Sequence, residues 1–319
     1  MSISLRTIAT ALLALMLTSP AIADYPERQI RMIVNFSAGG TTDAIARVLA
    51  SKVETLLGTN IVVSNVAGAG GTLGIAQTAQ GRGDGYLIGT ANMPAFAIIP
   101  HLRSVPYKPF EDLVQIAAVL PYEYAVLVRN DAPWQSWEEF VEYVRANPGK
   151  VTYGSVGAGT TNHLVMARIG MQLGLDWTHV PFQGGVKASA ALLGGHIDVI
   201  NNTMASVASA LQAGEIRALM VTSEKRFDLV PDVPTMQENG FDFAQISYMS
   251  IVAPKGLPDD IRSTLEAAFA EAVKDPQVLE AAARFDASPN FIAGADYAAL
   301  LQSLSEQWQD VITELKLKD

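Results

Sequence analysis

The chain has 319 residues, of which 49% are hydrophobic and 17% charged, a composition typical of a folded globular protein. Its 22 Lys and Arg residues against 32 Asp and Glu residues give a net charge of −10, which argues against a nucleic-acid-binding protein, because that function needs a concentrated basic surface. The sequence contains no cysteine, which excludes disulfide bonds, thiolate metal sites and cysteine nucleophiles.

The first 23 residues have the pattern of a secretory signal peptide. Arg6 supplies a positive charge, residues 8–17 form an apolar run too short to span a bilayer, and Ala21 and Ala23 form an A-x-A cleavage site. A buried N-terminal helix is the alternative. We therefore expect cleavage after Ala23, and a periplasmic mature chain without a lipid-anchoring cysteine.

Short apolar runs alternate with amphipathic segments in the following part of the chain. We expect strands over 30–34, 60–63 and 86–89, a helix over 43–57, and a second helix through Ile75 and Ala79. This order implies a parallel, doubly wound sheet with helices on both faces.

The same alternation restarts in the middle of the chain. Further strands are expected over 125–128, 151–153, 178–180, 197–200, 218–221 and 248–253. Further helices are expected over 137–146, 160–173, 187–193, 207–213, 259–272, 276–284 and 296–315. A long helical tail after a second lobe usually packs back onto the first lobe.

The residues therefore predict an α/β protein with two doubly wound lobes. Its expected parts are a signal peptide over 1–23, the first lobe over 24–123, the second lobe over 124–246 and the completion of the first lobe over 247–319. The chain crosses between the lobes twice, near 120–126 and 244–251, and two crossings form a hinge beside a ligand cleft.

Two strand–helix turns, one in each lobe, are the strongest candidates for a binding site. The first covers residues 34–43 and the second residues 153–163, and each has glycines and hydroxyl side chains directly before a helix. N–H groups at a helix start are unpaired and partly positive, so such turns bind anions without Lys or Arg. We expect valine at Gly39 or Gly159 to block the ligand's approach. For the first of the two turns, the alternative is an ordinary strand–helix turn in which Thr41 or Thr42 caps the helix.

A series of short motifs, which follow one another in a set order along the mature chain, strengthens this interpretation. They lie at residues 25–34, 38–43, 46–47, 65–71, 84–86, 153–164, 179–184, 217–223, 231–235 and 253–256. In this series the chain resembles the tripartite tricarboxylate transporter substrate-binding receptors, also called Bug or TctC-type proteins. The resemblance implies a type II-like periplasmic-binding-protein fold that closes around a small carboxylate, held by main-chain donors, hydroxyls and water. It also implies delivery to a membrane permease, with no catalysis, cofactor or metal, and we expect a monomer.

The expected ligand-binding residues come from the two turns, by position in the family motifs, and from neighbouring strand ends at the cleft. They are Phe36, Ser37, Ala38, Gly39, Gly40, Asn92, Ser155, Gly157, Gly159, Thr160, Thr161, Phe182 and Asn202.

Several other side chains have two interpretations. Asn35, Asn201 and Asn202 would favour a ligand with further polar groups if they point into the cleft, and turn or cap contacts are the alternative. Four apolar or aromatic side chains could form an apolar wall of the pocket or simply belong to the core: Met93, Phe96, Phe182 and Tyr248. His163 fits the family motif and has a structural alternative, and we expect Asp43 to be structural, since an exposed carboxylate would repel an anion.

A ligand-sensing receptor that signals to a membrane partner and an exported hydrolase are the other functions considered. The sequence has no G-x-S-x-G elbow, its four histidines lack metal-site spacing, and it has no proper dinucleotide fingerprint. Transport and sensing need the same fold, so the residues leave both open. They also leave open whether the ligand is a dicarboxylate, an amino acid, an aromatic acid or a sugar acid.

Overall fold

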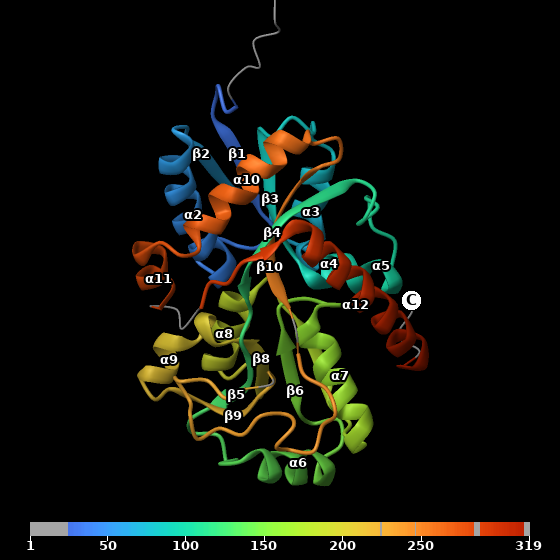
Figure 1. Cartoon of the computed structure of the whole chain (residues 1–319). Coiled ribbons are helices and arrows are strands. Elements are labelled where there is room, and N and C mark those ends of the chain that lie inside the picture. The colour runs from blue at the N-terminus through green and yellow to red at the C-terminus, as the bar shows by residue number, and fades with distance from the viewer. Residues whose placement is uncertain (1–24, 224, 246, 284–287, 316–319) are drawn as a thin grey trace, which may run out of the picture.

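Two α/β lobes joined by two chain segments make up the molecule (Figure 1). The computed structural model describes residues 25–223, 225–245, 247–283 and 288–315, and the predicted signal peptide lies outside this part. No helix in the described part is long and apolar enough to cross a membrane.

The first lobe contains a six-stranded sheet in the order β11-β4-β10-β3-β1-β2. Its strands are β1 (Ile30–Val34), β2 (Ile61–Asn65), β3 (Leu87–Asn92), β4 (Leu113–Pro121), β10 (Tyr248–Pro254) and β11 (Ile292–Ala293). One face is covered by α2 (Thr41–Leu57), α10 (Asp259–Ala272) and α11 (Pro276–Ala283). The other carries η1 (Ala69–Gly71), α3 (Thr72–Ala79), α4 (Met93–Ala97), α5 (Ile99–Leu102) and α12 (Gly294–Leu315).

The second lobe contains a five-stranded sheet in the order β7-β6-β8-β5-β9. Its strands are β5 (Tyr124–Arg129), β6 (Thr152–Ser155), β7 (Thr178–Pro181), β8 (Val199–Thr203) and β9 (Ile216–Val221). One face packs against α6 (Trp137–Ala146) and α7 (Thr161–Leu173). The other packs against α8 (Gly185–Leu193), η2 (Met204–Ser206) and α9 (Ala208–Gln212).

The strand directions correct the expectation of parallel sheets. β1, β2 and β3 are parallel to one another, as are β6, β7 and β8, but β10 runs antiparallel to β3 and β4, and β5 runs antiparallel to β8 and β9. The reason is topological. β5 and β10 each follow a crossing between the lobes, so they enter their sheets from the cleft, where the parallel strands end. Both sheets are therefore mixed.

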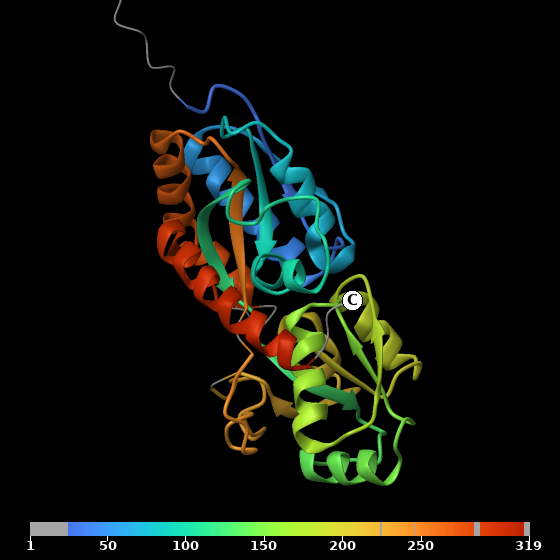
Figure 2. The same cartoon turned by 90° about the vertical axis from the view of Figure 1, so that its right-hand side faces the viewer.

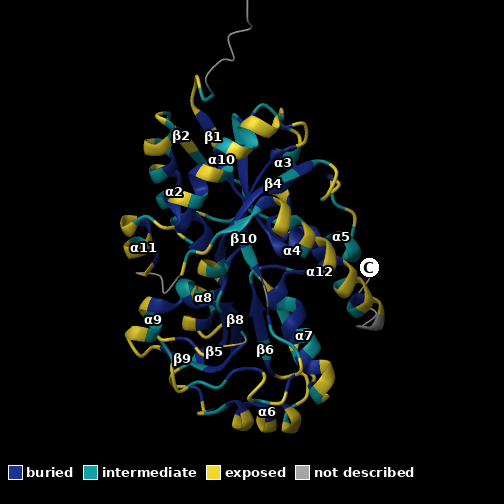
Figure 3. Ribbon diagram, viewed as in Figure 1, coloured by how far each residue is buried: buried dark blue, intermediate teal, exposed yellow. Residues whose placement is uncertain are grey.

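The C-terminal helix α12 packs on the sheet of the first lobe. Tyr297 and Leu301 of α12 are fully buried in the same cluster as Phe96 of α4 and Val252 of β10. Leu164 of α7 also belongs to this cluster, so α12 reaches the second lobe beside the cleft, as Figure 2 shows. The central strands of both lobes are buried, the edge strands β2 and β7 are partly exposed, and the outer helix faces are exposed (Figure 3).

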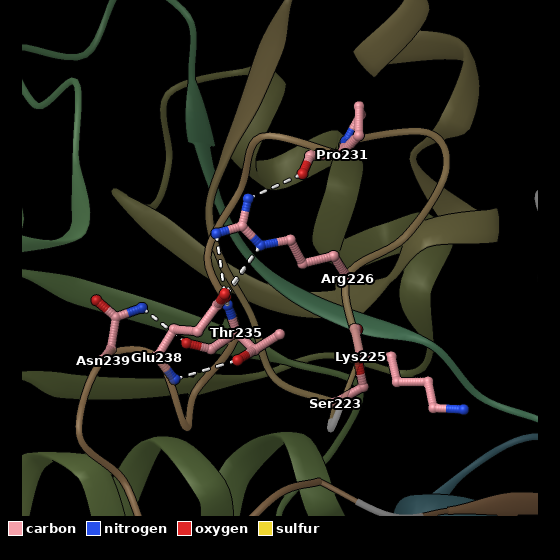
Figure 4. Close-up of polar contacts among 7 residues, drawn as sticks. All are labelled: Ser223, Lys225, Arg226, Pro231, Thr235, Glu238 and Asn239. Carbon is pink, nitrogen blue, oxygen red and sulfur yellow. Dashed lines mark hydrogen bonds and ion pairs between the residues drawn. The ribbon is translucent and has the colours of Figure 1, made fainter.

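The return crossing includes a long segment, residues 222–247, with no helix or strand assigned in its described part. Its conformation depends on side-chain contacts around Arg226, whose guanidinium binds Glu238 and donates to the carbonyl of Pro231 (Figure 4). Glu238 also accepts from the N–H of Thr235 at 2.8 Å and donates its own N–H to the Thr235 hydroxyl at 3.2 Å. These bonds brace the segment internally, while Phe227, Met236 and Phe241 pack into the cores of the second lobe.

Candidate ligand-binding site

One pocket lies between the two lobes, where helix starts from both of them meet. The empty space there is about 550 Å³, which includes its opening to solvent. It is lined by Phe36, Ser37, Gly40, Thr41, Thr42, Asn92, Pro94, Tyr122, Tyr124, Val156, Thr160, Thr161, Asn162, Gly184, Gly185, Val186, Asn202, Thr203 and Ser206. None of the described residues lining it is charged.

The first-lobe turn leads from β1 into α2 through Gly39, which has a φ of +81°. Its N–H donates to Oδ2 of Asp43 at 2.9 Å, and Oδ1 of Asp43 accepts from Arg47 and from Asn65, both at 2.9 Å. The Asp43 carboxylate therefore braces the turn, is neutralised by Arg47, and does not line the pocket. Asp43 has the structural role expected from the sequence.

The second-lobe turn repeats this arrangement between β6 and α7. Gly159 has a φ of +75°, and its N–H donates to Nδ1 of His163 at 3.1 Å, four residues later as in the first lobe. Thr160, the N-cap residue, donates its hydroxyl back to the Gly157 carbonyl at 2.7 Å and makes no side-chain cap bond to the helix. In both lobes the side-chain contacts of the turn leave the first N–H groups of the helix uncapped.

A third helix start, that of α8, also faces the pocket. Gly184, its N-cap residue, and the following Gly185 and Val186 line the pocket after β7. These three residues were not among the predicted site residues, although the same strand–glycine–helix pattern is present here in the sequence. The first N–H groups of a helix have no partner within the helix and carry partial positive charge. Three such termini around one neutral pocket form a favourable environment for a small anion.

Hydroxyl groups connect the lobes at the pocket. Oγ1 of Thr41 lies 3.1 Å from Oγ1 of Thr203 and 3.0 Å from Oγ of Ser206, and Ser37 donates to the carbonyl of Gln183 at 2.9 Å. Each of these contacts joins the first lobe to the second. The structure therefore shows the lobes in contact beside the pocket.

Two tyrosines from the outgoing crossing complete the pocket wall. Tyr122 and Tyr124 alternate around the end of β4 and the start of β5, and Oη of Tyr122 lies 2.6 Å from the hydroxyl of Thr42. Burial raises the pKa of Tyr122, and it raises the pKa of Tyr124 to about 12. Both phenols therefore remain protonated at neutral pH and can donate. Sequence reasoning missed them because it did not predict β4, which directs them to the cleft.

The predicted site residues fall into two groups. Those lining the pocket are Phe36, Ser37, Gly40, Asn92, Thr160, Thr161 and Asn202, and those elsewhere are Ala38, Gly39, Ser155, Gly157, Gly159 and Phe182. Most of the second group lie within the two turns. A Cβ on Gly159 would lie 2.9 Å from Cδ1 of Leu102 and 3.2 Å from Cγ1 of Ile99, both in the other lobe, whereas one on Gly39 would meet nothing within 4 Å.

The suggested apolar wall is not the one the structure contains. Met93, Phe96 and Tyr248 pack in the first-lobe core, and Phe182 packs against the second-lobe core. The apolar lining comes from other residues, among them Phe36, Pro94, Val156 and Val186.

Asn35 is also buried away from the pocket. It donates to Oδ1 of Asn92 at 2.8 Å and accepts from the hydroxyl of Thr90 at 2.7 Å. It therefore holds the pocket residue Asn92 at the end of β3, and its amide is not directed to a ligand.

A stack of three rings supports the second-lobe turn. The rings of His163 and His179 lie 3.9 Å apart between centroids, and Tyr153 stacks on His179 at 4.9 Å. Nε2 of His179 lies 2.7 Å from the hydroxyl of Ser155, and this hydroxyl donates its hydrogen to the carbonyl of Gly157. Burial lowers the pKa of His163 to about 4, and burial followed by the charge of His163 lowers that of His179 to about 3. Both imidazoles are therefore neutral near pH 7.

Ser155 and His179 do not form an exposed nucleophile, since Ser155 is fully buried. The described residues contain no group of His, Asp and Glu side chains that could hold a metal ion. Two lobes, a hinge and an interlobe pocket define the class of two-lobe solute-binding proteins.

Comparisons with known proteins identify the family. Residues 45–317 match the tripartite tricarboxylate transporter family receptor, TctC. The chain is 35% identical over 311 residues to the "UPF0065 protein in gbd 5'region" of Cupriavidus necator, covering 97% of this chain and 94% of the relative. It is 32% identical over 315 residues to BugT of Bordetella pertussis, covering 98% and 95%. The chain therefore belongs to the TctC family of tripartite tricarboxylate transporter receptors, whose members are substrate-binding receptors and not enzymes.

Solved structures agree with this assignment. The periplasmic binding protein BugD superposes with a TM-score of 0.86 at 31% identity, covering 92% of this chain and 99% of BugD. MatC of Rhodopseudomonas palustris, solved with bound malate, gives 0.83 at 27% identity, covering 90% and 100%. The R. palustris protein Rpa4515, solved with adipate, gives 0.86 at 26% identity, covering 92% and 99%. These neighbours confirm the type II-like, two-lobe fold.

We predict that the histidine stack makes stability depend on pH in a defined window. Below about pH 6.5 both histidines become protonated in the unfolded chain but stay neutral in the folded protein. The free energy of unfolding therefore decreases as the pH is lowered, until the pH reaches the folded-state pKa values of about 4 for His163 and about 3 for His179. Urea unfolding between pH 7 and pH 4 measures this slope. The double variant His163→Asn, His179→Gln keeps an acceptor near Nδ1 of residue 163 and a hydrogen-bonding group near Nε2 of residue 179, and should have a shallower slope. An unchanged slope would contradict the assignment.

Proposed function

We propose that this protein captures a small organic carboxylate between its lobes in the periplasm and delivers it to the membrane permease of a tripartite tricarboxylate-type transporter. The observation that carries the proposal is the uncharged pocket surrounded by the N-termini of α2, α7 and α8. A carboxylate there can accept from main-chain N–H groups of both lobes, so binding it favours the closed arrangement.

The lining also limits the kind of acid. Phe36, Val156 and Val186 supply apolar contact, while Thr161, Tyr124 and Asn202 supply neutral polar groups. Malate in MatC and adipate in Rpa4515 are small carboxylates of this kind, bound by relatives with the same fold. We therefore infer a ligand of similar size with few charges.

The alternative receptor function, signalling ligand to a membrane sensor partner, would use the same pocket. Membership of the TctC family favours transport, because the family is defined by its transporter. Deleting the cognate permease genes should abolish uptake of the ligand. Intact uptake accompanied by loss of a ligand-dependent response would favour sensing.

Export is the first requirement of this function. We predict that the exported protein begins at Asp24, because Ala21 and Ala23 form the cleavage signal. Intact-mass measurement of the protein from the periplasmic fraction tests this. A mass that includes residues 1–23 would contradict the prediction.

Binding to carboxylates is tested by thermal shift with ligand-stripped mature protein. A carboxylate at 100 times its dissociation constant should stabilise the protein by about 2.7 kcal/mol, and its neutral amide analogue should have no effect. The panel covers dicarboxylates, amino acids, aromatic acids and sugar acids, each with its amide. A shift from neutral compounds alone would overturn the proposed ligand class.

A pair of glycine variants separates contact between the lobes from backbone strain. Valine at Gly39 or Gly159 is strained by a similar positive φ, at a cost of roughly 1–2 kcal/mol of stability. Only Gly159→Val places its side chain against Ile99 and Leu102 of the other lobe. We expect the dissociation constant, measured by calorimetry, to rise roughly tenfold for Gly159→Val. Contrary to the expectation from the sequence, Gly39→Val should change it little, because a side chain there meets nothing within 4 Å and Gly39 does not line the pocket. Equal losses in both variants would contradict the role of interlobe contact.

A further inference from the structure

Two consecutive asparagines, Asn201 and Asn202, lie at the carboxyl end of β8, and both are fully buried. Asparagine is disfavoured in strands, and burying its amide is costly unless the amide is hydrogen-bonded. Such a pair in the middle strand of a sheet therefore needs specific partners. The partners found are the first turns of the two helices of the second lobe that face the pocket.

Asn201 contacts the start of α7. Nδ2 of Asn162, a pocket residue in the first turn of that helix, donates to the carbonyl of Asn201 at 2.9 Å and to its Oδ1 at 3.3 Å. Asn201 in turn donates to Oε1 of Gln245 at 2.9 Å, and Gln245 also accepts from Thr222 at 2.8 Å. Gln245 and Thr222 belong to the return crossing, so this chain of bonds joins the start of α7 to the hinge.

Asn202 contacts the start of α8. Its Nδ2 donates to the carbonyl of Gly185 and to the hydroxyl of Ser189, both at 3.0 Å, and its Oδ1 accepts from the N–H of Thr203 at 2.9 Å. The fit at Gly185 is close, because a Cβ there would lie 2.8 Å from Oδ1 of Asn202. The first turn of α8 therefore rests directly on this amide.

Successive residues of a strand point to opposite faces of the sheet, and α7 and α8 cover opposite faces of this one. Two adjacent amides on a single strand can therefore each hold one helix start. The pair stands where β8 ends at the pocket, and Asn202 itself contributes to the lining.

We infer that Asn201 and Asn202 are positioning residues for ligand binding, which fix the N-termini of α7 and α8 toward the pocket from the two faces of one sheet. The inference rests on the proposed function. In this role the two amides set the direction of the main-chain N–H donors at the starts of α7 and α8. Hydrogen bonding for stability alone would not require this.

The test uses Asn201→Val and Asn202→Val in the full mature protein, because valine suits a strand and lacks the amide. The Asn201→Val variant should fold, because two hydrogen bonds do not depend on the Asn201 side chain. Asn162 still donates to the main-chain carbonyl of residue 201, and Gln245 still accepts from Thr222. The matched control is Val199→Ala, a fully buried core position on the same strand that contacts neither helix start through a hydrogen bond. It should lower the melting temperature without altering the pocket.

Affinity is measured by calorimetry at a temperature where all variants are folded, with the tightest compound from the panel of acids and amides. We expect Asn202→Val to raise the dissociation constant roughly tenfold, Asn201→Val to raise it by a smaller factor, and Val199→Ala to leave it unchanged. Wild-type affinity in both asparagine variants would overturn the inference. If the tightest compound is neutral, the proposed carboxylate function fails, while the comparison among variants still decides the positioning role.

Hydrogen exchange of the ligand-free protein gives a second readout. Exchange at the first hydrogen-bonded amide of α7, Leu164, should accelerate in Asn201→Val, and at that of α8, Ala188, in Asn202→Val. Equal acceleration at both amides in both variants would mean general loosening of the lobe, and would overturn the assignment of one helix to each amide.

Discussion

Main-chain N–H groups at the starts of three helices have no acceptor within their helices, and all three starts face one pocket. This arrangement explains several neighbouring features. Asp43 and His163 bond to the turn glycines and do not line the pocket, and Thr160 directs its hydroxyl back to Gly157. By contrast, Ser136 caps α6 in the usual way, accepting from the N–H of Glu139. The donors at the pocket are left uncapped, and the lining adds no charge that would select among acids by itself.

The crossings between the lobes both connect the lobes and shape the site. β4 runs toward the cleft and β5 continues into the second sheet, so Tyr122 and Tyr124 stand on the connection itself. The return crossing carries Gln245, which bonds to Asn201 behind the start of α7. Pocket-lining residues and residues of the two crossings therefore lie in the same part of the molecule, and Gln245 of the return crossing bonds directly to Asn201. A ligand that contacts both lobes can shift the balance between arrangements of this hinge by its difference in affinity for them.

Periodicity in the sequence was sufficient to predict most helices and strands, because each buries one apolar face. The helices over 137–146 and 259–272 were predicted with the bounds observed. β4 was not predicted, and the sheets are mixed where parallel ones were expected, because strand direction depends on which lobe the chain enters and from which end. Local patterns carry no information about that choice.

The sequence by itself determined the two glycine turns that precede α2 and α7, since a positive φ at Gly39 and Gly159 and a helix start are local properties. Only the tertiary structure decided which residues surround the pocket. It brought the start of α8 and the two tyrosines to the same space and placed Phe182, half-buried, against the second-lobe core. The physical reason is that a pocket between lobes is formed by segments distant in sequence, whose approach is set by the packing of both sheets and the hinge.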